Sequence, residues 1–136
     1  MSYSRTETML NSYRNAGLTG LVQDASPHRL IHLLLDGALT RLAAAKGAME
    51  AGDAAQKGRM LGSAMSIVAA LRGCLNTSDG GQIATNLESL YDYMNRRLLD
   101  ASAHNEREAV DEVIALMRQV ASAWEQVPAQ TPAKAA

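Results

Sequence analysis

The sequence predicts an all-α protein, an antiparallel four-helix bundle with a short N-terminal helix and a disordered C-terminal tail. Hydrophobic residues make up 47% of the 136 residues, yet there are four Tyr, one Trp and no Phe. The apolar residues are mainly Ala, Leu, Met, Val and Ile, a mixture that favours helix over sheet. Along four segments they recur at intervals of three and four, the spacing of one helical face. Short turns between helices of similar length favour antiparallel neighbours.

The first long helix is expected to start at Ser26-Pro27 and to run to about Glu50. Ser26 is a typical N-cap, and proline suits the first helical turn. Gly52 can end the helix in a left-handed conformation, and Asp53 with Gln56 predicts a capping box for the next helix. The expected core stripe of this first helix consists of Ile31, Leu35, Ala38, Leu42, Ala45 and Met49.

The other three helices repeat this pattern. The second is expected to bury Leu61, Ala64, Val68, Leu71 and Leu75, before the polar, glycine-rich segment 76–81 forms a loop. The third, ending near His104, is expected to bury Ile83, Leu87, Leu90, Met94, Leu98 and Ala101. Asn105 with Glu108 predicts a capping box for the fourth. Its expected stripe is Val110, Val113, Met117, Val120 and Trp124, and it stops at Val127-Pro128.

One domain is expected to span residues 1–127, with the four long helices in 26–127. Residues 1–22 are expected to be a weaker helical segment interrupted by glycines, which acts as a hinged lid that docks reversibly. Residues 128–136 lack bulky apolar side chains and are expected to be a disordered tail.

The charge balance argues against nucleic acid as a partner. Thirteen Lys and Arg stand against fourteen Asp and Glu, so there is no surplus positive field to bind phosphates. No secretion signal and no apolar stretch long enough to span a bilayer is recognised, so direct membrane insertion is not expected. The single Cys cannot form an intramolecular disulfide, which suits a reducing compartment.

One group of side chains in the sequence could bind a metal ion. His28, His32 and Asp36 are spaced i, i+4, i+8 along the first helix, and two imidazoles one turn apart can chelate a divalent ion. No second His or Cys pair completes the site, and no His follows a Glu by three residues, as di-iron bundles require. Cys74 is better explained as a packed small hydrophobe than as a nucleophile. We therefore expect no enzyme activity, cofactor or metal, with a metal-dependent enzyme as the alternative of a different class.

Apolar side chains exceed what one core stripe needs. Five of the six residues 30–35 are large aliphatics, and Met and Tyr side chains flank the stripes of the second and third helices. A single bundle core absorbs only part of such a circumference. Either the N-terminal segment covers this extra surface, or the surface is a groove for an amphipathic partner helix. A displaceable lid would reconcile the two explanations.

The chain resembles the flagellin-specific export chaperones of the FliS type. The matching residues are Tyr13, the segments 25–31 and 35–39 in the first long helix, 86–94 and 96–98 in the third, and Ala123-Trp124 in the fourth. The resemblance covers about residues 3–127. It implies a cytoplasmic chaperone that binds the C-terminal helical segment of flagellin and prevents premature polymerisation. It also implies delivery to the flagellar type III secretion apparatus, with a contact at the export gate. The alternative is an adaptor for another flagellar or regulatory protein's amphipathic helix.

The predicted partner-binding residues are apolar and lie off the expected core stripes. Tyr13 is assigned to the lid, and this residue, Leu30, Tyr91 and Tyr93 also match the family. The full predicted set is Tyr13, Leu30, Leu33, Leu34, Met60, Met65, Tyr91 and Tyr93.

Overall fold

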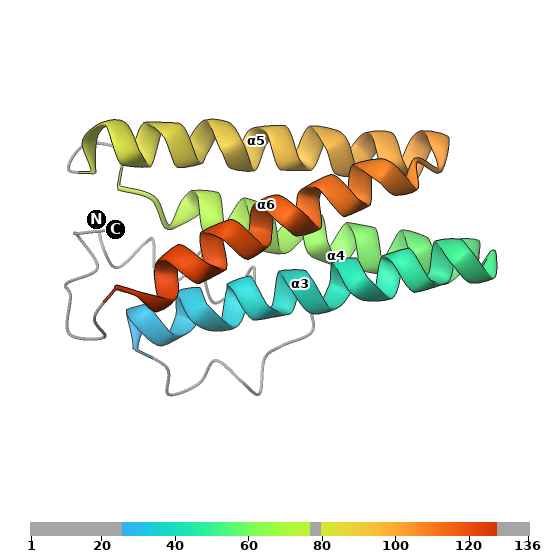
Figure 1. The fold of residues 1–136 in the computed structure, drawn as a ribbon, viewed down its shortest axis with the longest axis horizontal. Coiled ribbons are helices and arrows are strands. Elements are labelled where there is room, and N and C mark those ends of the chain that lie inside the picture. The colour runs from blue at the N-terminus through green and yellow to red at the C-terminus, as the bar shows by residue number, and fades with distance from the viewer. Residues whose placement is uncertain (1–25, 77–79, 128–136) are drawn as a thin grey trace.

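The computed structural model describes residues 26–76 and 80–127, which form four helices (Figure 1). They are α3 (Pro27–Ala51), α4 (Ala54–Gly73), α5 (Gly81–His104) and α6 (Arg107–Glu125). The expected N-terminal helix, the lid and the C-terminal tail lie outside the described residues. Within these residues no helix combines the length and the hydropathy that crossing a membrane requires.

The four helices pack antiparallel in a closed ring, as the sequence predicts. Helix α3 contacts α4 and α6, and α5 contacts the same two neighbours from the other side. Figure 1 shows α6 starting beside the end of α5 and crossing obliquely toward the start of α3. Because of this oblique path, α6 lies beside α5 near their common turn and apart from it at the other end of the bundle.

The predicted turn between α3 and α4 is confirmed. The Ser26 hydroxyl accepts a hydrogen bond from the backbone N–H of Arg29 at 3.2 Å and caps α3. Gly52 ends this helix with φ 72°, a left-handed conformation that glycine adopts without steric penalty. The Asp53 carboxylate then accepts from the Gln56 N–H at 3.1 Å and starts α4. Only this half of the predicted capping box is present, because the Asp53 N–H donates to the Ala48 carbonyl at 2.9 Å and the Gln56 side chain pairs with Arg59.

The predicted capping box at the start of α6 is wrong. Asn105 has φ 55° and is the left-handed C-cap of α5, so it terminates one helix instead of starting the next. Asn tolerates this conformation better than most residues with a side chain. Glu106 occupies the N-cap position of α6 and makes no side-chain capping bond. The connection has only these two residues, which leaves no separate position for a box built on Asn105.

The core is an aliphatic seam along the bundle axis. Among the described residues the buried side chains are aliphatic or Met, apart from Tyr91, and none is charged. The fully enclosed large side chains are Leu34, Leu35, Leu42, Leu61, Ile67, Leu71, Met94, Leu98, Met117, Val68 and Val110. At about 1.5–3 kcal/mol for each large aliphatic, burial of this set is the main term that stabilises the fold.

The expected stripe of α5 is wrong in its first half. Ile83 was expected in the core but is 73% exposed, and Leu87 and Leu90 are only half-buried. Ala84 and Tyr91 occupy the core positions instead, at 1% and 4% exposure. The helix is therefore rotated relative to the expectation, and its larger aliphatics lie beside the seam.

Candidate functional site

An apolar groove of about 470 Å³ lies between the first half of α5 and the second half of α6. Its volume is within the range of sites that bind small molecules or side-chain anchors. The lining residues are Ile31, Leu35, Leu71, Cys74, Leu75, Gly80, Ile83, Leu87, Leu90, Tyr91, Leu116, Gln119, Val120, Ala123, Trp124 and Val127.

The groove exists because α6 leaves α5. The two helices meet at the short turn, and α6 then runs toward the start of α3 (Figure 1). The row Ile83, Leu87 and Leu90 on α5 consequently faces Leu116 and its neighbours on α6 across an open space. Two apolar helix faces that diverge in this way leave room for a further element between them.

Burial divides the groove into a floor and a rim. Leu35 and Leu71, each 2% exposed, and Tyr91 form the floor, which is continuous with the core. Burial raises the pKa of the Tyr91 hydroxyl above its ordinary value, and the nearby Cys74 thiol adds to the shift. Ile83 stands at the rim, where most of its side chain is exposed. An exposed large aliphatic beside an apolar hollow is typical of a binding surface.

The described residues that line the groove carry no charge, and Gln119 contributes the one side-chain amide among them. The groove thus offers apolar burial and little polar recognition. Such a surface is suited to the apolar face of an amphipathic helix.

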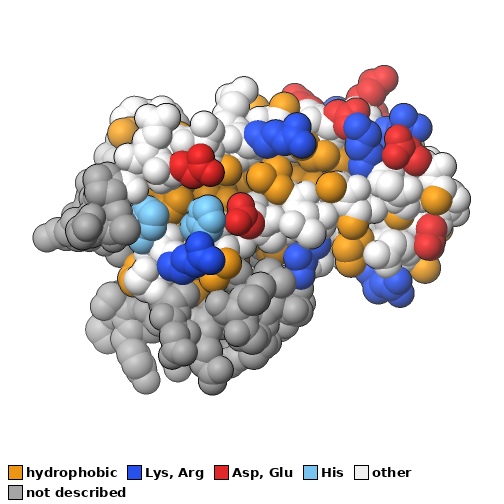
Figure 2. Space-filling view, turned by 60° about the horizontal axis from the view of Figure 1, so that its bottom comes forward, with side chains coloured by type: hydrophobic (Ala, Val, Ile, Leu, Met, Phe, Trp, Pro, Cys, Tyr) orange, Lys and Arg blue, Asp and Glu red, His pale blue; other side chains and the backbone are white. Residues whose placement is uncertain are grey.

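One wall of the groove is held by a contact between the first turn of α3 and the end of α6. The rings of His28 and Trp124 are stacked, with centroids 4.9 Å apart and planes inclined by 22°. The His28 Nε2 lies 2.9 Å from the carbonyl oxygen of Val127, and Trp124 Nε1 donates to the His28 carbonyl at 3.3 Å. In Figure 2 histidine side chains lie next to hydrophobic ones at this end of the molecule.

The three residues considered for a metal site are not brought together. The His28 ring is turned toward α6, whereas His32 Nε2 lies 3.2 Å from Asp36 Oδ2 in a pair within α3. The three residues therefore serve two separate contacts, one between α3 and the end of α6 and one within α3.

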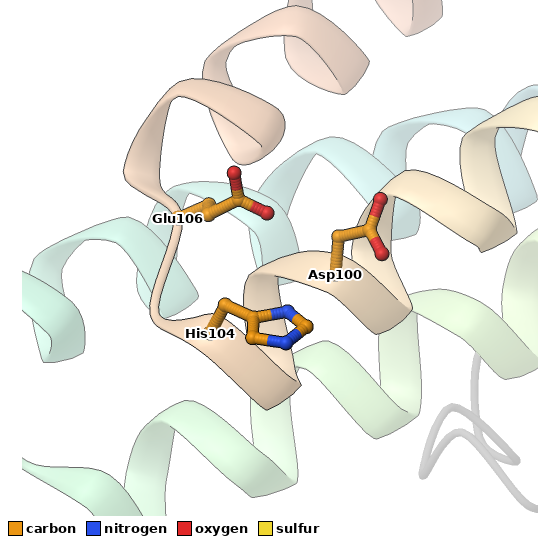
Figure 3. A group of neighbouring side chains, drawn as sticks. All are labelled: Asp100, His104 and Glu106. Atoms are coloured by element: carbon orange, nitrogen blue, oxygen red, sulfur yellow. The ribbon is translucent and has the colours of Figure 1, made fainter.

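A different group of possible ligands lies at the α5–α6 turn. The ligand atoms of Asp100, His104 and Glu106 lie within 4.8 Å of one another (Figure 3). Asp100 Oδ2 already pairs with Arg97 Nη1 at 3.2 Å, and His104 and Glu106 are exposed. Exposed acidic groups of this kind are common in proteins without a metal, so the cluster does not indicate one.

The predicted partner-binding residues are scattered in the structure. Tyr91 lines the groove, as part of its floor. Leu30 and Leu34, expected outside the core, are buried in it at 5% and 0% exposure, because α3 packs on both α4 and α6 and so buries a wider face than one stripe. Tyr13 lies outside the described residues.

The other predicted residues, Leu33, Met60, Met65 and Tyr93, are half-buried and do not line the groove. The first three pack against the core cluster. Tyr93 donates a hydrogen bond to Glu112. Their contact with a partner stays a prediction.

Most residues that line the groove were missed because the sequence assigned them to the core. Ile83, Leu87 and Leu90 have the correct helical spacing for a core stripe, as do Val120 and Trp124 on α6. The available signal was a second stripe on α5, Ala84 to Tyr91 to Met94, which fits the seam equally well. Of two adjacent apolar stripes on one helix, one can pack in the core while the other lines a second apolar surface, here the groove.

Comparison with known proteins identifies the family. The family model described as "Flagellar protein FliS" matches residues 9–131, nearly the whole chain. The chain belongs to the FliS family. It is 40% identical over 119 residues to the flagellar secretion chaperone FliS of Vibrio cholerae, covering 88% of each chain. It is 43% identical to the flagellar secretion chaperone FliSB of Pseudomonas aeruginosa over 116 residues, 85% of this chain and 92% of the relative. With FliS of Salmonella typhimurium it shares 42% identity over 123 residues, 90% of this chain and 91% of the relative.

Proposed function

We propose that this protein is a cytoplasmic flagellar secretion chaperone that binds the C-terminal helical segment of flagellin in the groove between α5 and α6. The observation that carries the proposal is the groove itself, an uncharged apolar hollow with exposed Ile83 at its rim. Membership of the FliS family, whose relatives are named flagellar secretion chaperones, supports the choice of client. The chemistry is binding, without covalent catalysis or a cofactor.

Apolar burial supplies the driving force. A disordered client segment has to be ordered on binding, which costs on the order of 2–5 kcal/mol. Each large aliphatic side chain that it buries contributes about 1.5–3 kcal/mol. Two or three client anchors in a groove of about 470 Å³ therefore offset the ordering. Gln119 offers a hydrogen bond that can orient the client.

The biological consequence is masking. An amphipathic helix whose apolar face lies in the groove cannot use that face to pack on another flagellin subunit, so premature polymerisation is prevented. The cost of ordering the client keeps affinity moderate for the area buried. Moderate affinity allows release at the flagellar type III secretion apparatus, where we propose that the chaperone also contacts the export gate.

Isothermal titration calorimetry tests this function. The full chain is titrated with a synthetic peptide of the flagellin C-terminal segment, and with a peptide of equal length from the flagellin N-terminal segment as control. We expect saturable binding of the first peptide with a negative heat-capacity change, the mark of apolar burial. Binding to both peptides alike, or to neither, would contradict the proposed client.

A further inference from the structure

We propose that His28 is a positioning residue for client binding, which holds Trp124 and Val127 in place as one wall of the groove. The binding part of this inference rests on the proposed function. His28 is not among the residues that line the groove, whereas both of its partners are: Trp124 in the last turn of α6 and Val127 just beyond the helix. It therefore acts through them and not by touching the client.

The contact is reciprocal. The His28 side chain reaches the backbone of Val127, and the Trp124 side chain reaches the backbone of His28, across separations of 99 and 96 residues. A carbonyl oxygen can only accept, so the Nε2 atom of His28 carries the hydrogen in this bond. The stacked rings add a third contact between the same two chain segments.

The end of α6 needs such a contact. The last four carbonyl groups of a helix have no partner within the helix. Here those of Ala123 and Trp124 accept from the N–H groups of Gln126 and Val127, and the Val127 carbonyl, two residues beyond the end of α6, is bonded by His28. The buried residues of α6 end at Met117. Beyond this point its side chains are half-buried or exposed, and Val120, Ala121 and Trp124 pack against the core only in part. The contacts with His28 connect this end of α6 to α3.

The position of Trp124 matters to the groove because the indole is the largest side chain in its lining. If the ring turned away, the groove would widen and a client anchor would lose contact area on that side. Affinity depends on the close contact of many atom pairs, each of which loses about a quarter to a half of its attraction over a gap of roughly 0.5–1 Å. His28 therefore determines the shape of the groove wall that the client contacts.

The first experiment uses Trp124 as a reporter, since it is the only tryptophan in the chain. We expect His28→Ala to shift the fluorescence maximum to longer wavelength and to increase quenching by acrylamide, with unchanged far-UV circular dichroism. His28→Phe keeps a ring for stacking and should restore most of the protection. His32→Ala is the matched control, one turn further along α3 and paired with Asp36, and should behave as the unsubstituted chain. Equal quenching in all four proteins would overturn the inference.

The second experiment measures binding of the flagellin C-terminal peptide by calorimetry. We expect His28→Ala to weaken binding about tenfold, the effect of losing roughly one hydrogen bond and one ring contact. The affinity of His28→Phe should lie between those of His28→Ala and the unsubstituted chain, and His32→Ala should bind as the latter does. Unchanged affinity of His28→Ala, together with altered fluorescence, would overturn the role of His28 in binding and leave the proposed function intact.

Two further outcomes are distinct. If the unsubstituted chain does not bind the peptide, the proposed function fails, and with it the binding part of this inference. If His28→Ala loses its helical circular dichroism, His28→Phe provides the comparison, because it fills the same space. His28→Phe lacks the Nε2 hydrogen bond to Val127 but keeps a ring beside Trp124. If this variant shows full protection of Trp124 and full affinity for the peptide, the hydrogen bond is not needed. That result would overturn the reciprocal contact as the cause of the groove wall's position.

Discussion

The hydroxyl of Tyr93 donates a 2.7 Å hydrogen bond to the carboxylate of Glu112 and joins α5 to α6. Arg97 Nε donates to the other carboxylate oxygen at 2.8 Å. The Tyr93 hydrogen bond, followed by that of Arg97, lowers the pKa of Glu112 below its ordinary value of 4.5. The same bond to Glu112 raises the pKa of Tyr93. This network lies between the groove and the α5–α6 turn. At this level of the bundle the two helices are still in contact.

Tyr93→Phe should raise the pKa of Glu112 toward its ordinary value, because the hydrogen bond that lowers this pKa most is removed while that of Arg97 remains. An NMR titration of the Glu112 carboxyl carbon measures this. A carboxylate with a depressed pKa stabilises the fold above its unfolded-state pKa, and the stabilisation is lost as pH falls through the folded-state pKa. The stability difference between Tyr93→Phe and the parent should therefore shrink in acid. An unchanged Glu112 titration would contradict the hydrogen bond.

Leu34→Ala should reduce the free energy of unfolding by about 2–5 kcal/mol, because the side chain is fully enclosed and its removal leaves a cavity. Leu33→Ala, at the half-buried neighbouring position, should cost clearly less. Urea denaturation followed by circular dichroism compares the two. The sequence alone placed Leu34 off the expected core stripe, among the partner-binding residues. Equal, small losses in both variants would favour that earlier assignment.

The sequence predicted the number, order and boundaries of the long helices well, because caps and breakers are local signals. Gly52 acts through its own backbone conformation and Asp53 through a carboxylate that accepts from the N–H three residues on, and both cap positions were predicted correctly. The groove could not be predicted in the same way. Whether Ile83 or Ala84 faces the seam depends on the path of α6, which is set by contacts almost one hundred residues apart in the chain. The spacing fits either residue, and side-chain size favours Ile83 as the larger apolar residue.

A matched pair of glycines tests the local part of this account. Gly52→Ala should destabilise the fold by about 1 kcal/mol, because a Cβ atom is unfavourable at φ 72°. Gly58→Ala should stabilise it by roughly 0.5–1 kcal/mol, since Gly58 lies within α4 and an added Cβ meets no atom within 4 Å. Thermal unfolding of both variants measures the difference. The same sign of change in both would contradict the left-handed cap.

The predicted lid is tested by deletion. Removing residues 1–17 should leave the helical circular dichroism per folded residue intact, since the core described above comes from α3 to α6. If this segment competes with the client for the groove, the deletion should tighten binding of the flagellin C-terminal peptide. An unchanged calorimetric titration would indicate that the segment is no lid.

The central claim is that the client binds between α5 and α6, and one pair of variants tests it most directly. Ile83 and Leu99 are both exposed aliphatics of α5, at 73% and 57%, but only Ile83 lines the groove. In calorimetry with the flagellin C-terminal peptide, Ile83→Asp should bind at least about tenfold more weakly, since an apolar contact is lost and a carboxylate is desolvated. Leu99→Asp should bind as the parent does, and both should retain their helical circular dichroism. Parental affinity in Ile83→Asp, or an equal loss in Leu99→Asp, would contradict the groove as the client site.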